Sequence, residues 1–334
     1  MQTPLDNWLP ARIGPYVPLR FIRSGGFSSI IAARHEKSGQ RVALRILFPR
    51  YKFNCSLRHN FLHGAKLLRS LNHPNWLVVM ESGKSHGLIY TAMELIDSGT
   101  LGNLILEQAE TLRNHAMPVM LGAARGLSHL HARGWLHLDF KPENVLIKAP
   151  WQPILIDLDL ARRLPRKREK GKRVRRVPGT PAYMAPELLQ NHRISERSDV
   201  FAFGVTCFEI LTFHKPWGTT PQELSLAYSK REGQPPLTLR YWNPTVSPAL
   251  AGIIHRCIQL NPEDRYPTIH MVLRDLERIG DQTLVHSDPK DPLFDTVMLR
   301  SAAPVSTPPP ESPEPGRPQM TPKPYWVKKQ PGGY

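Results

Sequence analysis

The sequence contains only three cysteines among 334 residues. Cys55, Cys207 and Cys257 are widely spaced and odd in number, which excludes a disulfide framework and a cysteine-rich metal site. Long hydrophobic runs are also missing, because the longest, VFAFGVTCFEIL, is too short to span a bilayer and contains Glu209. The opening MQTPLDNWLPARIG lacks the apolar core of a signal peptide. We therefore expect a soluble protein of the reducing cytoplasm.

Hydroxyl side chains are missing from one strongly basic segment. Between Arg162 and Gly179 there is no Ser, Thr or Tyr, and ten Lys or Arg stand against one Glu. This local charge of +9 supplies more than half of the net charge of +16. This run is typical of a solvated loop. It is equally consistent with contact between residues 162–176 and an acidic partner or an anionic membrane surface. Nucleic acid is the least favoured partner, because no aromatic residues are interleaved for base stacking.

Two regimes of hydrophobic pattern follow each other along the chain. Up to Met93 the runs are mostly short and separated by turn signals, and from Thr100 to Gly280 most have helical spacing. Expected strands are 17–26, 28–35, 41–48, 76–83, 88–95, 144–148 and 153–159, and expected helices are 57–71, 100–112, 117–134, 198–213, 247–260 and 268–279. The pattern predicts an α+β fold with a strand-rich small lobe, a helical large lobe and a cleft between them.

The segment from Asp281 onward has a different composition. It is rich in proline and shows no hydrophobic period. We read it as disordered or polyproline II. A plain tail is favoured over a ligand for a proline-binding partner module.

One stretch, HLDFKPENVLI, concentrates chemically active side chains. Asp139, Lys141 and Asn144 lie in a loop before a β-like run, and Asp157 ends the next such run. Two carboxylates and an amide from adjacent loops suit a hard cation and a phosphate chain. Asp and Asn can also simply cap loops, but the strings GTPAYMAPELL and SDVFAFG follow at fitting distances.

With these motifs the chain resembles the protein kinases of the Ser/Thr type and is similar to their soluble bacterial members, from about Tyr16 to Ile279. The resemblance implies a bilobal protein-kinase fold with a small lobe over 14–93, a hinge over 94–98 and a large lobe over 99–280, ahead of the tail at 281–334. It also implies ATP and Mg²⁺ as cofactors, a protein substrate or partner, and a role in signalling.

The resemblance implies a role for each matching residue. Asp139 matches the aspartate that orients the substrate hydroxyl and accepts its proton, and Lys141 matches the lysine that steadies the γ-phosphate. Asn144 and Asp157 match the two magnesium ligands. The nucleotide itself is expected to lie against Ile22, Gly25, Gly26, Ile30, Ala43, Arg45, Met93, Glu94, Ile96 and Leu146.

Other matches imply structural contacts in the large lobe. Glu187 is expected to form an ion pair with Arg265. Asp199 is expected to brace the catalytic loop from below, and Thr180 is expected to lie beside Asp139.

The ion pair of the small lobe departs from the family pattern at both ends. Arg45 of VALRIL replaces the lysine that contacts the phosphates, and Gly64 replaces the glutamate of the facing helix. No Asp or Glu lies between Glu36 and Glu81, so no acid of this helix can pair with Arg45. We therefore expect an anion such as the nucleotide phosphates to neutralise Arg45, which should point into the cleft.

Further departures lie in the glycine loop and the large lobe. RSGGFSS keeps one of the three expected glycines and has Arg23 at the first position, which should loosen or reshape the loop. In DLDL, Leu158 replaces the aromatic residue of the D-F-G motif and Asp159 replaces its glycine. Leu138 replaces the arginine that reads a loop phosphate, so loop phosphorylation should not switch this protein.

The kept and lost groups support two hypotheses. The favoured one is Mg-ATP binding with weak or absent phosphotransfer to protein Ser/Thr, as in a pseudokinase. The alternative is an active divergent Ser/Thr kinase that uses Asp139 as its base, since catalysis here is mostly positioning and charge neutralisation. A small-molecule kinase of the aminoglycoside type is disfavoured, because GTPAYMAPE is typical of a loop that binds protein substrates.

Overall fold

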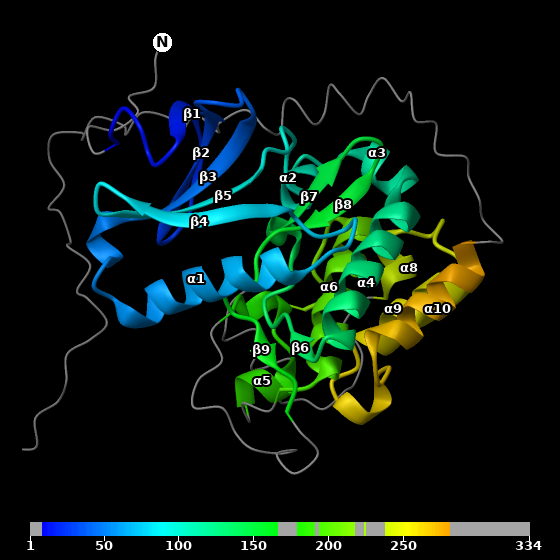
Figure 1. The fold of residues 1–334 in the computed structure, drawn as a ribbon. Coiled ribbons are helices and arrows are strands. Elements are labelled where there is room, and N and C mark those ends of the chain that lie inside the picture. The colour runs from blue at the N-terminus through cyan, green and yellow to red at the C-terminus, as the bar shows by residue number, and fades with distance from the viewer. Residues whose placement is uncertain (1–8, 166–178, 191–193, 218–223, 225–237, 281–334) are drawn as a thin grey trace, which may run out of the picture. The chain divides into compact units, whose positions relative to one another are not determined.

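A five-stranded antiparallel sheet forms the small lobe in the computed structural model (Figure 1). The structure describes residues 9–165, 179–190, 194–217, 224 and 238–280. The strand order is β1-β2-β3-β5-β4, with bounds β1 Tyr16–Ser24, β2 Ser28–His35, β3 Arg41–Leu47, β4 Val79–Ser85 and β5 Leu88–Glu94. The five strands predicted in this region are confirmed, with small shifts at their ends.

Strand β3 lies at the centre of the sheet, and both of its faces are covered. Val42, Leu44 and Ile46 are fully buried in an apolar cluster on one face. Ala43 belongs to the larger core that continues into the large lobe. Because side chains alternate along a strand, Arg45 shares the face of Ala43 and is directed toward the large lobe.

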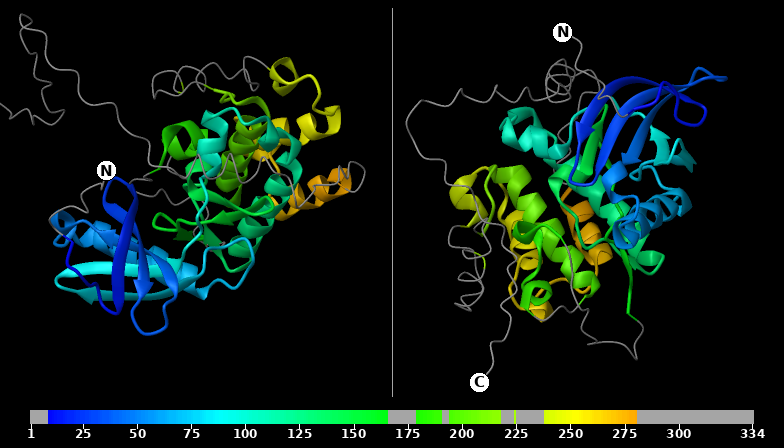
Figure 2. Two further views of the ribbon diagram at one scale, coloured as in Figure 1. Left: turned by 90° about the horizontal axis from the view of Figure 1, so that it is seen from above. Right: turned by 90° about the vertical axis from the view of Figure 1, so that its left-hand side faces the viewer.

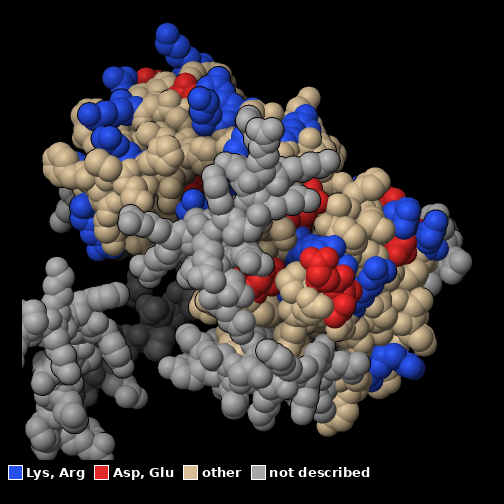
Figure 3. All heavy atoms as spheres, turned by 90° about the horizontal axis from the view of Figure 1, so that it is seen from below, with Lys and Arg blue, Asp and Glu red and all other residues tan. Residues whose placement is uncertain are grey.

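Helix α1, Cys55–Ser70, is the one long helix of the small lobe among the described residues. Asn54 caps it by accepting a hydrogen bond from the Leu57 backbone N–H. Its inner side buries Phe61, Gly64 and neighbouring residues against the core. Its outer side is basic, and Figure 3 shows Lys and Arg side chains gathered over the small lobe.

The large lobe is mainly helical (Figure 2). Its helices are α2 Leu101–Leu106, α3 Glu110–Asn114, α4 Ala116–Ala132, α5 Pro186–Gln190, α6 Glu196–Thr212, α8 Leu239–Trp242, α9 Pro248–Cys257 and α10 Ile269–Gly280. Helix α6 is buried along almost its whole length because α4, α8, α9 and α10 pack around it. Two short strand pairs face the small lobe: β6 Trp135–Leu136 with β9 Arg162–Arg163, and β7 Val145–Lys148 with β8 Gln152–Leu155.

The predicted α+β bilobal architecture is confirmed, with one correction among the helices. The single helix predicted over 100–112 is two helices, α2 and α3, because Gln108 adopts a left-handed φ of 50° between them. The tail at 281–334 and residues 166–178 of the basic segment lie outside the described residues. Within the described residues, no helix combines the length and the apolar character needed to cross a membrane.

Candidate active site

Asp199 of α6 holds the catalytic loop by its backbone. Its carboxylate accepts hydrogen bonds from the N–H groups of His137 and Leu138, at 2.7 and 2.8 Å, and lies 2.8 Å from Nε2 of His131. Leu138 has a left-handed φ of 63°, which costs free energy for a residue with a side chain. Burial would raise the pKa of Asp199, but His131 lowers it overall. The predicted bracing role of Asp199 is confirmed.

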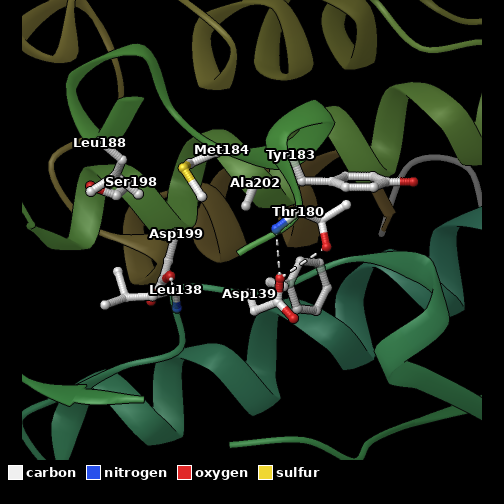
Figure 4. Close-up of a pocket in the computed structure, with 10 residues that line it drawn as sticks. Leu138, Asp139, Thr180, Tyr183, Met184, Leu188, Ser198, Asp199 and Ala202 are labelled. Carbon is white, nitrogen blue, oxygen red and sulfur yellow. Dashed lines mark hydrogen bonds between the residues drawn. The ribbon is translucent and has the colours of Figure 1, made fainter. Parts of the chain in front are cut away.

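Asp139 lies at the centre of a hydrogen-bonded cluster (Figure 4). Its Oδ1 accepts from the backbone N and the Oγ1 of Thr180, at 3.1 and 3.2 Å. Its Oδ2 lies 3.2 Å from Nζ of Lys141, which also donates to the Thr180 hydroxyl. A carboxylate beside an ammonium group and a hydroxyl can accept a proton from a bound alcohol and balance a phosphoryl charge.

A small cavity lies beside this cluster, between the catalytic loop and α6, and Asp139 and Thr180 line part of it (Figure 4). It is lined by Leu138, Met184 and Ala202 among others and has a volume of about 10 Å³. Such a volume holds about one water molecule. The cavity therefore belongs to the packing under the loop and is not a nucleotide site.

Two oxygen-bearing side chains could hold a cation beside Asp139. The Asn144 amide nitrogen donates to the Asp139 carbonyl at 2.9 Å, which leaves its Oδ1 as the atom able to bind a cation. Asp157 follows β8 and accepts a hydrogen bond from the Asp159 N–H at 2.9 Å. Carboxylate and amide oxygens suit Mg²⁺, which commonly completes its shell with water and phosphate. Among the described residues, no three His, Cys, Asp or Glu side chains gather as a separate metal site.

Arg45 forms a bidentate ion pair with Asp159, the third residue of the DLD motif. The distances are 2.9 Å from Nη1 to Oδ1 and 2.7 Å from Nη2 to Oδ2, and Nε lies 3.3 Å from the Ser28 hydroxyl. The side chains of Arg45 and Asp159 are only 13% and 4% exposed. The expectation that Arg45 has no acidic partner in the protein is wrong, because the acid comes from a different segment than the helix.

The charges at this point determine one another's pKa values. Burial would lower the pKa of Arg45, but the carboxylates of Asp159 and Asp157 raise it. Burial and the nearby charge of Asp157 raise the pKa of Asp159 to about 7, against the opposing effect of Arg45. Burial would also raise the pKa of Asp157, but Arg45, 3.7 Å away, lowers it. One guanidinium serves two carboxylates that repel each other, so a bound cation would favour the ionised form of both.

Gly64 is the residue of α1 that lies against Asp159. A Cβ atom at Gly64 would lie 2.4 Å from Oδ1 and 2.8 Å from the backbone nitrogen of Asp159. Both distances are shorter than van der Waals contact, so only glycine fits here without a shift. In the sequence, Gly64 indicated only the loss of the family's glutamate and gave no sign of this packing role.

Arg23 is a second cation of the sheet that sequence reasoning gave no binding role. The strand register pairs Arg23 with Ile30 and Ile30 with Arg45, so the three lie in one row across β1, β2 and β3. Directly opposed residues share a face of a sheet. Burial and the charge of Arg45 lower the pKa of Arg23, while Asp157 opposes them. Within the described part of the chain, Arg23 has no ion-pair partner.

The residues expected around the purine fall into two groups. Ala43 and Met93 are buried in the core, and Ile30, Ile96 and Leu146 pack partly buried against it. Other members stand apart from this cluster: Ile22 in β1, Gly25 and Gly26 in the β1–β2 turn, and Glu94, whose side chain contacts Lys148 at 2.6 Å. A Cβ atom at Gly26 would meet no protein atom within 4 Å. Protein packing therefore does not explain the glycine at position 26.

A buried ion pair ties the start of helix α5 to the segment that precedes α10. Both Nη atoms of Arg265 donate to the Glu187 carboxylate at 2.9 Å. Arg265 is fully buried and also donates to backbone carbonyls such as that of Gln259. The predicted pairing of these two residues is confirmed.

The fold and these contacts agree with a comparison against known families. Residues 16–276 match the family model described as the protein kinase domain. The chain belongs to the protein kinase family.

Relatives place this kinase domain in the Ser/Thr type. It is similar to the serine/threonine-protein kinase PknL of Mycobacterium tuberculosis, with 30% identity over 261 residues, covering 78% of the chain and 64% of the relative. It is also similar to PknB of the same species, with 29% identity over 260 residues, covering 76% of the chain and 41% of the relative. The chain thus spans less than two thirds of the length of these relatives.

The fold comparison agrees with the family. A crystal structure of the Mycobacterium tuberculosis PknI kinase domain matches with a TM-score of 0.61 at 20% identity, covering 80% of this chain and 97% of the other. In this kinase domain Leu158 is fully buried in the same core as Leu68 and Val79, and His137 is also fully buried. Leucine in place of the aromatic residue therefore still fills the apolar interior.

Proposed function

We propose that this kinase domain binds Mg-ATP between its lobes and transfers the γ-phosphoryl group only weakly to Ser or Thr of proteins. The observation that carries the proposal is the cluster in which Lys141, Asn144 and Thr180 each lie within hydrogen-bond distance of Asp139. Asp139, Lys141 and Asn144 match the family's catalytic loop in both type and order. Their mutual contacts support a site arranged for a substrate hydroxyl.

Each side chain has a separate task in this proposal. Asp139 orients the substrate hydroxyl and accepts its proton, while Lys141 balances the charge of the phosphoryl group. Asn144 and Asp157 would hold Mg²⁺, which supplies charge neutralisation on the phosphates when bound. The apolar side chains of Ile30, Ala43, Met93, Ile96 and Leu146 would enclose the purine, together with Ile22. Gly25 and Gly26 would cover the phosphates, and Glu94 lies at the hinge.

Two features of the small lobe support slow phosphoryl transfer. Arg45 is occupied by Asp159, and the glycine loop keeps only Gly25 of the family's three glycines. Phosphates that are held less well are also aligned less well. A misplacement of about 1 Å can cost on the order of 100-fold in rate.

One observation favours the alternative of a fully active kinase. Arg45 does have an acidic partner, so it is held in place as the family's lysine is. Its three hydrogen bonds use three of the five guanidinium N–H groups, which leaves two for a phosphate oxygen.

The setting of this activity follows the family. We propose a cytoplasmic signalling protein with a kinase domain over 14–280, acting on a protein substrate or partner. The basic segment at 162–176 would contact an acidic partner or an anionic membrane surface rather than nucleic acid. The proline-rich segment at 281–334 would be a plain tail or bind a partner module.

Thermal melting in the presence of ATP tests the binding step directly. A ligand of the folded state raises the melting temperature, by an amount that corresponds to about 2.7 kcal/mol at one hundred times its Kd. We expect a rise with Mg-ATP, and a much smaller rise when Mg²⁺ is omitted or when Asp157→Asn is tested. An unchanged melting temperature at millimolar Mg-ATP would refute nucleotide binding.

Arg23→Ala should weaken Mg-ATP binding on the order of 10-fold, because a hydrogen bond to a charged group contributes about 1.5–3 kcal/mol. The affinity for adenosine, which has no phosphate, should stay unchanged. Calorimetric titration with both ligands measures this. Arg34→Ala is the matched control, since Arg34 is exposed on β2. Equal loss for ATP and adenosine would show that Arg23 does not contact phosphate.

A further inference from the structure

Three departures from the family pattern meet at one point of this structure. Arg45 of β3 replaces a lysine, Gly64 of α1 replaces a glutamate, and Asp159 after β8 replaces a glycine. Each change alone removes a feature of the family. Together they make a single contact, in which the acid has moved from the helix to the segment after β8.

The geometry shows that the two acid positions exclude each other. A Cβ atom at position 64 would point at the Asp159 carboxylate and approach its Oδ1 to 2.4 Å. The Asp159 side chain therefore occupies the space that a side chain from the helix would enter. That same carboxylate binds Arg45 through both oxygens and is only 4% exposed.

We infer that Asp159 supplies the acid that positions Arg45 in this chain. We also infer that glycine at position 64 leaves the space that the Asp159 side chain occupies. Asp159 acts as a positioning residue, since its contacts are to Arg45 and Asp157. Its backbone N–H donates to Oδ1 of Asp157 at 2.9 Å. One residue thus fixes both the cation of β3 and the carboxylate beside the catalytic loop.

The relocation changes what α1 controls. An acid on the helix would couple the position of Arg45 to the position of α1. Here α1 contributes apolar packing, as with Phe61, whose ring lies 5.0 Å from the Arg45 guanidinium carbon, and it contributes no ion pair to Arg45. The alignment of Arg45 with Asp157 therefore depends on the segment after β8 and not on a charge carried by α1.

Moving the acid back to the helix tests this inference, and it does so without nucleotide. The variants are Asp159→Gly, Gly64→Glu/Asp159→Gly and Gly64→Gln/Asp159→Gly, compared by melting temperature with circular dichroism as the check on folding. Any Cβ at position 64 strains the contact with the residue 159 backbone nitrogen, 2.8 Å away, so Glu and Gln carry the same strain. The two double variants therefore differ only in the charge offered to Arg45.

We expect Asp159→Gly to lower the melting temperature and the Glu double variant to recover at least half of the loss. The Gln double variant should recover none of it, and 0.5 M NaCl should shrink the Glu–Gln difference only slightly, because a buried pair is poorly screened. Equal behaviour of the two double variants, whether both fold or both fail to fold, overturns the inference. An Asp159→Gly variant with the same melting temperature as the wild type also overturns it. Because no ATP is present, these outcomes are independent of nucleotide binding.

Discussion

Arg45→Met is expected to lower the free energy of unfolding by up to about 3–5 kcal/mol, the cost that applies where the buried carboxylate of Asp159 stays ionised without its partner. Methionine keeps much of the length of arginine and can keep apolar contacts with the rings of Phe27 and Phe61, which lie 5.5 and 5.0 Å from the guanidinium carbon. The loss would therefore report the charge pair more than the packing. Urea unfolding monitored by fluorescence and circular dichroism measures it.

The small lobe offers a matched control for this prediction. Arg20 and Asp97 also form an arginine–aspartate pair, but their side chains are 43% and 51% exposed. Exposed pairs contribute about 0–1 kcal/mol, so Arg20→Met should have a small effect. Arg45→Met/Asp159→Asn should recover much of the stability lost in Arg45→Met, because only Asp157, whose side chain is 30% exposed, then loses its cationic neighbour. If Arg45→Met costs no more than Arg20→Met, the buried ion pair has no role in stability.

The catalytic loop could be predicted because its signal is local. Asp139, Lys141 and Asn144 lie within six consecutive residues. A loop that short keeps them close together however the neighbouring helices and strands are placed. The contacts of Asp199 and Thr180 followed from the family pattern, since each position is matched by a long motif. The sheet could be predicted for the same local reason, because alternation and turn residues mark its strands.

The partner of Arg45 could not be predicted from the local pattern. Asp159 is 114 residues away in sequence, and its contact depends on space that exists only because residue 64 lacks a side chain. A signal was present: an acid lost at position 64 and an acid gained at position 159 are complementary changes. The sequence interpretation treated them as separate defects, and only the three-dimensional contact joins them.

The position of Arg23 is a second case of this kind. Its place opposite Ile30 depends on an irregularity in the β1–β2 pairing between Phe21 and Arg23. Register of this type is set by a bulge and by tertiary packing, neither of which leaves a clear mark in one sequence. In the sequence, Arg23 in place of a glycine therefore indicated only a disrupted glycine loop. In the structure, Arg23 lies on the sheet face that carries Arg45 and adds a second cation there.

Asp139→Asn should reduce phosphotransfer by at least about 100-fold, because it removes the group that accepts the proton of the substrate hydroxyl. The amide keeps the size of the carboxylate and can still contact Thr180, so the fold should persist. Asp264→Asn is the control, since Asp264 is exposed in the large lobe. Equal melting temperatures for the two variants would show that a lost rate is chemical in origin.

Transfer of radiolabelled phosphate from Mg-ATP to the chain itself and to a panel of proteins tests the central claim most directly. We predict a slow rate, on the order of 100-fold below the roughly 1–100 s⁻¹ of typical protein kinases, on Ser or Thr and abolished by Asp139→Asn. Transfer that survives Asp139→Asn undiminished, or no transfer by a wild-type protein that binds Mg-ATP, would contradict a working catalytic loop at Asp139.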